Sequence, residues 1–178
     1  MKIILLLILF SCQDKHSDYI KSYQIAKVPN SLSNSDVDEK LSFKWLAPSN
    51  WITKTKSSMR AASYSVSSSK GEGDVSVMYL NGDGGGIAAN VNRWREQLSL
   101  PILSELEIES NAEVLISQIG KYYVYEIVNV NNKEASFLCS IIPADNFTIF
   151  IKLNAHAEAL DELKQEFIYF SSSFEYNE

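Results

Sequence analysis

The sequence predicts an α+β fold, in which an antiparallel β-sheet is flanked by helices. Stretches with strand character outnumber those with helical periodicity, and most of the strands are joined by short turns. Each predicted helix has a single apolar side to bury against a sheet. We expect this fold to form one domain over residues 41–178, which is enough chain to bury a core without disulfide bonds.

In the first half of the domain, the sequence predicts two strands and a helix. An apolar strand entry at residues 43–46 is broken by a turn at Pro48, and residues 60–66 and 75–80 are expected to pair as a hairpin with its turn at residues 71–73. After the glycine-rich stretch 82–86, apolar side chains recur at helical spacing until Pro101 ends the helix. These apolar positions are Ile87, Val91, Trp94 and Leu98.

The second half predicts an antiparallel meander followed by a helix. Strand signals cover residues 112–117, 122–130, 136–142 and 147–153. Asn154 is expected to cap a final helix with one apolar stripe. That stripe consists of Leu160, Leu163, Phe167 and Phe170. The alternating Glu105, Glu107 and Glu109 predict the solvated side of an extended segment.

The N-terminus has the order of an export signal. Lys2 precedes an uninterrupted apolar run of eight residues, 3–10, which is too short to span a membrane because a spanning helix needs about 20 residues. Leu9-Phe10-Ser11-Cys12 resembles the bacterial lipobox, so residues 1–11 are predicted to be a signal peptide and Cys12 the lipidated N-terminus. The polar residues that follow, up to residue 40, predict a flexible tether. The alternative is an apolar N-terminus buried in the fold.

The predicted location of the protein limits the classes of partner that it can bind. We expect a location in the bacterial cell envelope, lipid-anchored on the periplasmic side or at the outer membrane, with the lipid on Cys12 as the contact to the membrane. Removal of residues 1–11 leaves 15 basic and 22 acidic residues, a formal charge of −7. An acidic domain repels phosphate backbones, so nucleic acid is not expected as a partner. With Cys12 acylated, Cys139 has no disulfide partner within the chain.

Two stretches resemble known families. Pro48-x-x-Trp51 after the strand entry, together with the closing strand and helix at residues 147–174, resembles the PsbP-like fold. The motif Gly85-Gly86-x-x-x-Asn90-x-x-Arg93-Trp94-Arg95-x-Gln97-Leu98 is similar to a signature of uncharacterised bacterial lipoproteins. The resemblance implies a PsbP-like sandwich and an accessory or partner-binding role, and it transfers no binding residue to this chain.

The predicted helix after the glycines carries the candidate binding residues. Asn90, Arg93 and Gln97 fall within one arc beside the apolar arc that contains Trp94. These side chains either hold a neighbouring loop or line a groove that recognises a carboxylate or a peptide. The glycines before them do not match the spacing of a nucleotide-binding loop, so we interpret them as a tight turn.

No catalytic constellation stands out. Cys139 could act as a nucleophile only with His156 nearby. The alternative is that Cys139 is a small, buried apolar residue of the core. His16 and His156 lack the paired spacing of metal ligands, so we expect neither a metal nor a cofactor. Trp45 and Trp51 are either core anchors or an exposed aromatic platform. The sequence favours a membrane-anchored envelope lipoprotein that binds a partner or ligand without catalysis, and the alternative is an envelope hydrolase that uses Cys139 and His156.

Overall fold

A computed structural model describes residues 43–55 and 59–177, which all lie within one compact unit, Glu39–Glu178. The predicted signal peptide, Cys12 and the predicted tether lie outside the described residues. None of the helices in the described part of the chain is both long enough and apolar enough to cross a membrane.

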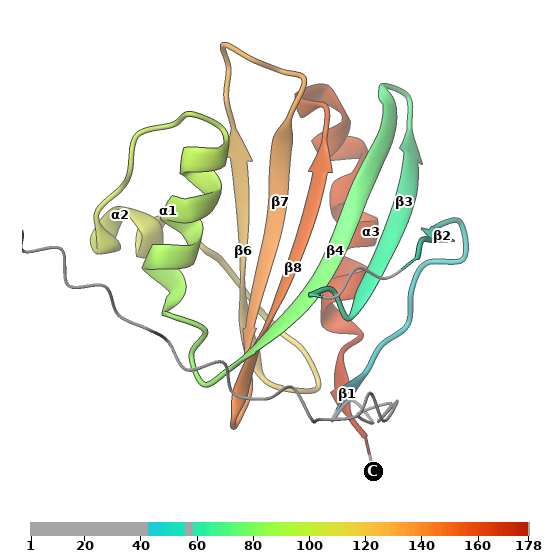
Figure 1. Cartoon of the computed structure of the whole chain (residues 1–178), viewed down its shortest axis with the longest axis vertical. Helices are drawn as coiled ribbons and strands as arrows, with labels where there is room; N and C mark the ends of the chain where they lie inside the picture. The colour runs from blue at the N-terminus through green and yellow to red at the C-terminus, as the bar shows by residue number, and fades with distance from the viewer. Residues whose placement is uncertain (1–42, 56–58, 178) are drawn as a thin grey trace, which may run out of the picture. The chain divides into compact units, whose positions relative to one another are not determined.

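The centre of the domain is a seven-stranded sheet in which all neighbours are antiparallel (Figure 1). In spatial order the strands are β2 (Ile52–Thr53), β3 (Ala62–Ser68), β4 (Gly71–Asn81), β8 (Phe147–Ala155), β7 (Ser136–Pro143), β6 (Lys121–Val128) and β5 (Glu113–Ile116). The helices are α1 (Ile87–Gln97), α2 (Glu105–Ser110), the 3-10 helix η1 (Ala157–Ala159) and α3 (Leu160–Ser172). The predicted α+β fold, with an antiparallel sheet flanked by helices, is confirmed.

Helices pack on both faces of this sheet and create two cores. α3 runs behind the sheet in Figure 1, whereas α1 and α2 stand in front of it beside β6. Side chains alternate along β6, so Tyr122 and Val124 join the core under α3, and Tyr125 and Ile127 join the core under α1 and α2. Alternation along the central strands therefore assigns each apolar residue to one of the two helical layers.

A cluster of aromatic rings closes one end of the α3 core. Here β1 (Phe43–Lys44) pairs with β9 (Glu175–Tyr176) as a separate two-stranded sheet. Trp45 stacks on Phe174 with the ring centroids 5.2 Å apart, and Trp51 packs against Phe170 at 4.8 Å. The indole nitrogen of Trp45 donates a hydrogen bond to the Tyr64 hydroxyl. Both tryptophans therefore act as core anchors, which was the first of the two alternatives.

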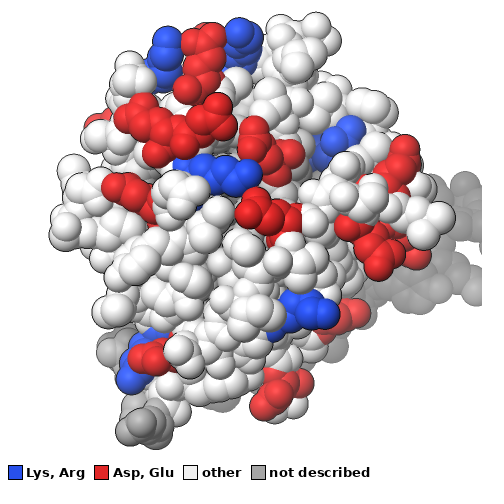
Figure 2. All heavy atoms as spheres, turned by 180° about the vertical axis from the view of Figure 1, so that it is seen from behind, with Lys and Arg blue, Asp and Glu red and all other residues white. Residues whose placement is uncertain are grey.

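The outer face of α3 is unevenly charged. Figure 2 views the molecule from this side and shows charged side chains gathered toward its upper end, with a broad uncharged area below. Lys164 in α3 forms ion pairs with Glu113, at 3.2 Å, and with Glu126, at 3.7 Å. α3 is thereby tied to β5 and β6 by charge as well as by its buried stripe.

The expected turn of the first hairpin is wrong by two residues. The turn is formed by Ser69 and Lys70, and residues 71–73 belong to β4. Gly71 follows the turn with φ +108°, a conformation that favours glycine. Gly73 lies where a Cβ atom would come within 2.9 Å of Val66 Cγ2, so it is glycine because of close packing rather than turning.

Two further expectations around the helices are wrong. Residues 105–110 form the short helix α2 rather than an extended segment, because Ser104 and Glu107 form a reciprocal capping box that starts the helix. Asn154 does not cap the last helix, since β8 continues to Ala155. His156 takes that place: its Nδ1 accepts a hydrogen bond from the backbone N–H of Glu158 and caps η1.

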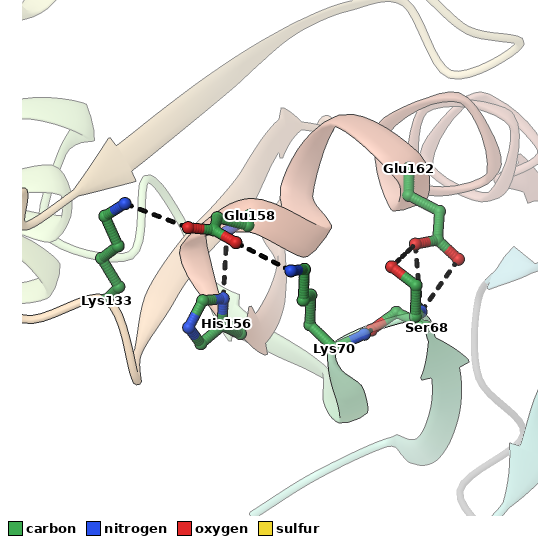
Figure 3. A network of polar contacts seen from close by, with 7 residues as sticks. Ser68, Lys70, Lys133, His156, Glu158 and Glu162 are labelled. Carbon is green, nitrogen blue, oxygen red and sulfur yellow. Dashed lines mark hydrogen bonds and ion pairs between the residues drawn. The ribbon is translucent and has the colours of Figure 1, made fainter.

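A group of charged side chains fastens one end of the sheet. Glu158 accepts from Lys70, at 2.9 Å, and from Lys133, at 3.0 Å, so it joins the β3–β4 turn to the β6–β7 loop (Figure 3). The side-chain hydrogen bonds from Lys70 and Lys133, followed by the charges of the two ammonium groups, lower the pKa of Glu158 from 4.5 to about 2. We call Lys70, Lys133 and Glu158 the charge clasp.

The charge clasp predicts a pH dependence of stability. Because the folded-state pKa of Glu158 lies below 4.5, the ionised carboxylate stabilises the fold above that pH, and this stabilisation is lost as the pH falls through about 2. Glu158→Gln is expected to lower the melting temperature at pH 7, and the difference from the wild type should shrink between pH 4.5 and pH 2. Thermal unfolding followed by circular dichroism measures both. Glu96→Gln, at an exposed position of α1, controls for the removal of a negative charge, and an equal effect of the two variants would contradict the prediction.

Candidate ligand-binding cleft

An open cleft of about 450 Å³ lies between the start of α1, the helix α2 and the strand β6. Its walls are mostly apolar or small, with four polar side chains among them. The lining consists of Gly85, Gly86, Ile87, Ala88, Ala89, Glu105, Ile108, Glu109, Tyr123 and Tyr125. Concave sites with apolar walls and a few convergent polar groups are the usual form of small-ligand sites, and the volume falls in their range.

Hydrogen bonds from α1 hold the α2 wall in place. The side chain of Asn92 makes two bonds of 2.9 Å to Leu103, donating to its carbonyl oxygen and accepting from its N–H. Arg95 Nε donates to the carbonyl oxygen of Pro101 at 2.8 Å. The connection between the two helices is therefore fixed at two points, and the width of the cleft is set by the chain itself.

Asn90 fixes the glycine turn, residues 82–86, which forms another wall of the cleft. Its Nδ2 donates to the carbonyl oxygens of Gly84, at 3.0 Å, and Gly86, at 2.7 Å. Gly84 and Gly86 have φ of +61° and +83°, a backbone conformation that glycine adopts readily and that is strained for other residues. α1 begins directly after Gly86 with no side-chain cap and no acidic residue in its first turn. Its first N–H groups are thus left for other acceptors at the rim of the cleft.

Tyr125 forms the floor of the cleft. Its side chain is almost fully buried, with 3% exposed, and its hydroxyl has no hydrogen-bond partner among the residues that the structure describes. Burial, with smaller contributions from Tyr123 and Glu109, raises the pKa of Tyr125 to about 12. The hydroxyl is therefore protonated at neutral pH. Among the described residues, the fully buried side-chain polar atoms without a partner are the hydroxyls of Tyr122 and Ser136, so the Tyr125 hydroxyl reaches solvent and is available to a water molecule or a ligand.

A second cavity, of about 280 Å³, shares two lining residues with the cleft. Ile108 and Tyr125 line both cavities, and the second one also contains Arg95, Glu126 and Lys164. The hydrogen bond from Lys164 to Glu113 and the nearby carboxylates raise the pKa of Lys164. Lys164 is paired with Glu113 and Glu126, and Arg95 donates to the carbonyl oxygen of Pro101.

The predicted binding residues divide into two buried and two exposed ones. Asn90 is 3% exposed and is used entirely within the chain, since its Oδ1 also accepts from Arg93 Nη1 at 2.9 Å. Trp94 is 8% exposed and its ring meets Phe150 edge to face at 6.3 Å. These two residues hold the loop and the core, which was one of the two readings of the motif.

Arg93 and Gln97 are exposed on the same helix. Gln97 Oε1 accepts from Lys152 Nζ at 2.8 Å, and that ammonium group also lies 4.5 Å from the centre of the Phe137 ring. Burial lowers the pKa of Lys152. Neither Arg93 nor Gln97 lines either of the two cavities described above, and their binding of a partner stays a prediction.

The structure does not bring Cys139 and His156 together. Cys139 lies opposite Lys152, whereas Ser136 lies opposite Ala155, so the thiol is about 10 Å along the ladder from the neighbour of His156. The thiol is fully buried, and burial raises its pKa well above 9.0. His156 Nδ1 is already occupied as a helix cap. The hydrolase alternative therefore lacks an activated nucleophile. Within residues 43–55 and 59–177, no group of three or more His, Cys, Asp or Glu side chains could hold a metal ion.

Sequence reasoning missed the two tyrosines of the cleft. Tyr123 and Tyr125 are two positions apart on β6, a spacing that places both side chains on one face of the sheet. That signal was present in the sequence. What it did not reveal was the wall opposite them, because the hydrogen bonds that position α2 join residues eleven apart, Asn92 and Leu103.

Comparisons with known proteins concern the fold. No protein-family model and no curated protein sequence matches the chain. The solution structure of cyanobacterial PsbP from Synechocystis sp. PCC 6803 is similar, with 20% identity over 76% of this chain and 87% of that one and a TM-score of 0.49. The crystal structure of LpqN, involved in cell envelope biogenesis of Mycobacterium tuberculosis, has 12% identity over 74% and 81% of the two chains and a TM-score of 0.49.

A third solved structure comes from Bacteroides thetaiotaomicron VPI-5482. It has 12% identity to this chain, covers 77% of it and 46% of its own length, and gives a TM-score of 0.45. At these identities no residue role is carried over from any of the three proteins.

Proposed function

We propose that this chain is a lipid-anchored, non-enzymatic accessory domain of the bacterial cell envelope, and that it binds a small ligand in the cleft between α1, α2 and β6. One observation carries the proposal of ligand binding. Tyr125 lines a cleft of about 450 Å³ with most of its side chain buried, and its hydroxyl has no hydrogen-bond partner among the described residues. A hydroxyl placed in this way is available to bond a molecule in the cleft.

The walls of the cleft support the same proposal. Asn92 and Arg95 hold the connection to α2, and Asn90 holds the glycine turn, through bonds between groups of the chain itself. A ligand therefore does not have to organise the site on binding, and the ordering cost that lowers affinity is small.

Binding in the cleft is expected to be measurable with a neutral apolar dye. N-phenyl-1-naphthylamine should gain fluorescence on addition of the full chain carrying Cys12→Ser, which removes acylation. Ala88→Phe adds a ring to the cleft lining and is expected to weaken dye binding at least tenfold, roughly 1.4 kcal/mol. The matched control is Glu96→Phe, which adds the same ring at an exposed position of α1 outside the lining. Equal loss in both variants would overturn the cleft as the site.

The lipid anchor rests on the lipobox-like residues that end at Cys12. We expect the mature protein from its native host to begin at Cys12 with a diacylglycerol group on the sulfur, and Cys12→Ser to abolish this modification. Mass spectrometry of the mature N-terminus measures it directly. An unmodified Met1 would contradict the anchor and leave the binding cleft as a separate question.

A further inference from the structure

The polar groups of the cleft come from different elements of its lining, among them the start of α1 and the helix α2. We infer that the cleft binds a small zwitterion, in which an ammonium group and a carboxylate are attached to one apolar body. This inference rests on the proposed function, because it names the chemical class of the ligand for the same cleft.

The anion-binding end is the start of α1. Ile87, Ala88 and Ala89 line the cleft and belong to the first turn of an eleven-residue helix, where N–H groups have no acceptor within the helix. No side chain caps this end, and its first turn contains no acidic residue. The nearby Asp83 carboxylate is bonded to the N–H of Gly85, before the helix begins. A ligand carboxylate can accept from the free N–H groups and is favoured by the helix dipole.

The cation-binding end is the side of α2 that faces the cleft. Glu105 and Glu109 are one helical turn apart, so they project on the same side, and both line the cleft. Neither forms an ion pair within the described part of the chain. Glu107, which lies between them, is turned back into the capping box with Ser104. The cleft lining contains no lysine or arginine, so two unbalanced carboxylates await a positive group.

The floor between the two ends links them to one ligand. Tyr125 is nearly buried, it lines the cleft together with Ile108, and its hydroxyl has no hydrogen-bond partner among the described residues. Glu109 and Tyr125 line the same cleft, so the tyrosine and the acidic end belong to one site. Tyrosine rings also attract an ammonium group through their faces. The volume of about 450 Å³ accommodates a body of about a dozen non-hydrogen atoms.

Charge distinguishes this ligand from simpler ones. A plain anion would meet Glu105 and Glu109, and a plain cation would meet the positive end of α1. Only a molecule that carries both charges satisfies both ends.

Three probes with the same phenyl group separate these possibilities: L-phenylalanine, phenethylamine and 3-phenylpropionate. Isothermal titration calorimetry with the full chain carrying Cys12→Ser is expected to show L-phenylalanine binding at least tenfold more tightly than either of the other two. Glu105→Gln with Glu109→Gln should weaken L-phenylalanine at least tenfold. Glu96→Gln with Glu134→Gln, which removes the same charge at exposed positions outside the cleft, should leave its affinity unchanged.

Tyr125→Phe keeps the ring and removes only the hydroxyl, so it tests the floor of the cleft. We expect it to weaken L-phenylalanine while leaving N-phenyl-1-naphthylamine binding and the melting temperature as they are. Unchanged L-phenylalanine affinity in this variant would remove the hydroxyl from the site and overturn the inference as stated.

The remaining outcomes separate this inference from the proposed function. If phenethylamine or 3-phenylpropionate binds as tightly as L-phenylalanine, one charged end is unused and the inference is overturned. If none of the probes binds, but the dye binds and Ala88→Phe blocks it, the zwitterion is excluded while the cleft remains a binding site. If neither the dye nor the probes bind, both proposals fall.

Discussion

Replacing Phe170 by alanine is expected to lower the free energy of unfolding by about 3–5 kcal/mol. Phe170 is fully buried on the inner side of α3. Its ring contacts three other aromatic side chains, with centroid distances of 4.8 Å to Trp51, 5.6 Å to Tyr64 and 5.4 Å to Phe174. The substitution removes the ring on which both the N-terminal and the C-terminal ends of the domain pack, and rigid neighbours on several sides prevent the cavity from collapsing.

Urea denaturation followed by circular dichroism measures this loss, and the adjacent Tyr169→Ala is the matched control. Tyr169 lies in the same helix with 56% of its surface exposed, so its removal should cost less than about 1 kcal/mol. Equal losses in the two variants would mean that the aromatic cluster is not the anchor of α3.

The apolar periodicity of the sequence predicted most of this arrangement. Four apolar residues recur at helical spacing, and all are buried on the inner side of α3: Leu160, Leu163, Phe167 and Phe170. The strands were found because each alternates or forms a short apolar run, as in β7, where seven of eight residues are buried. Such patterns arise from burial against a partner surface, which is the property that a fold class describes.

Boundaries and short elements were harder to predict because local hydrogen bonds decide them. Glu105, Glu107 and Glu109 alternate with apolar residues like a strand, yet Ser104 and Glu107 nucleate a helix. The S-x-x-E spacing of a capping box was present in the sequence and was outweighed by the period of two. In the same way, Asn154 is a favourable capping residue in isolation but remains in β8, where it lies opposite Asp74 and Phe137.

The sequence predicted the helix that borders the candidate site, but not the set of residues that line it. The motif around Asn90 was singled out from the sequence, and Asn90 bonds the turn at the rim of the cleft. The residues that line the cleft come from three elements separated by long stretches of sequence, from Gly85 to Tyr125. No single stretch of sequence contains all the lining residues. Helical and strand periodicity show which side of an element is buried, but not which elements face each other across a cleft.

The glycine turn provides the second large expected effect. Gly84→Ala is expected to cost about 2–4 kcal/mol, because two penalties add. The residue has φ +61°, where a Cβ atom is disfavoured, and that atom would lie 2.6 Å from Phe150 Cε2 and Cζ. The ring of Phe150 is 6% exposed and is packed against Trp94, so it has little room to move away.

Gly82→Ala separates the two penalties of Gly84→Ala. Gly82 has nearly the same φ, +63°, but no atom lies within 4 Å of an added Cβ, so only the backbone cost of about 1–2 kcal/mol is expected. Urea denaturation of both variants yields the difference, and equal losses would show that Phe150 can give way. Because Asn90 binds the carbonyl oxygen of Gly84, displacement of this turn also moves the rim of the cleft. N-phenyl-1-naphthylamine should therefore bind more weakly to the folded Gly84→Ala variant than to Gly82→Ala, which would connect the packing beneath the turn to the ligand site above it.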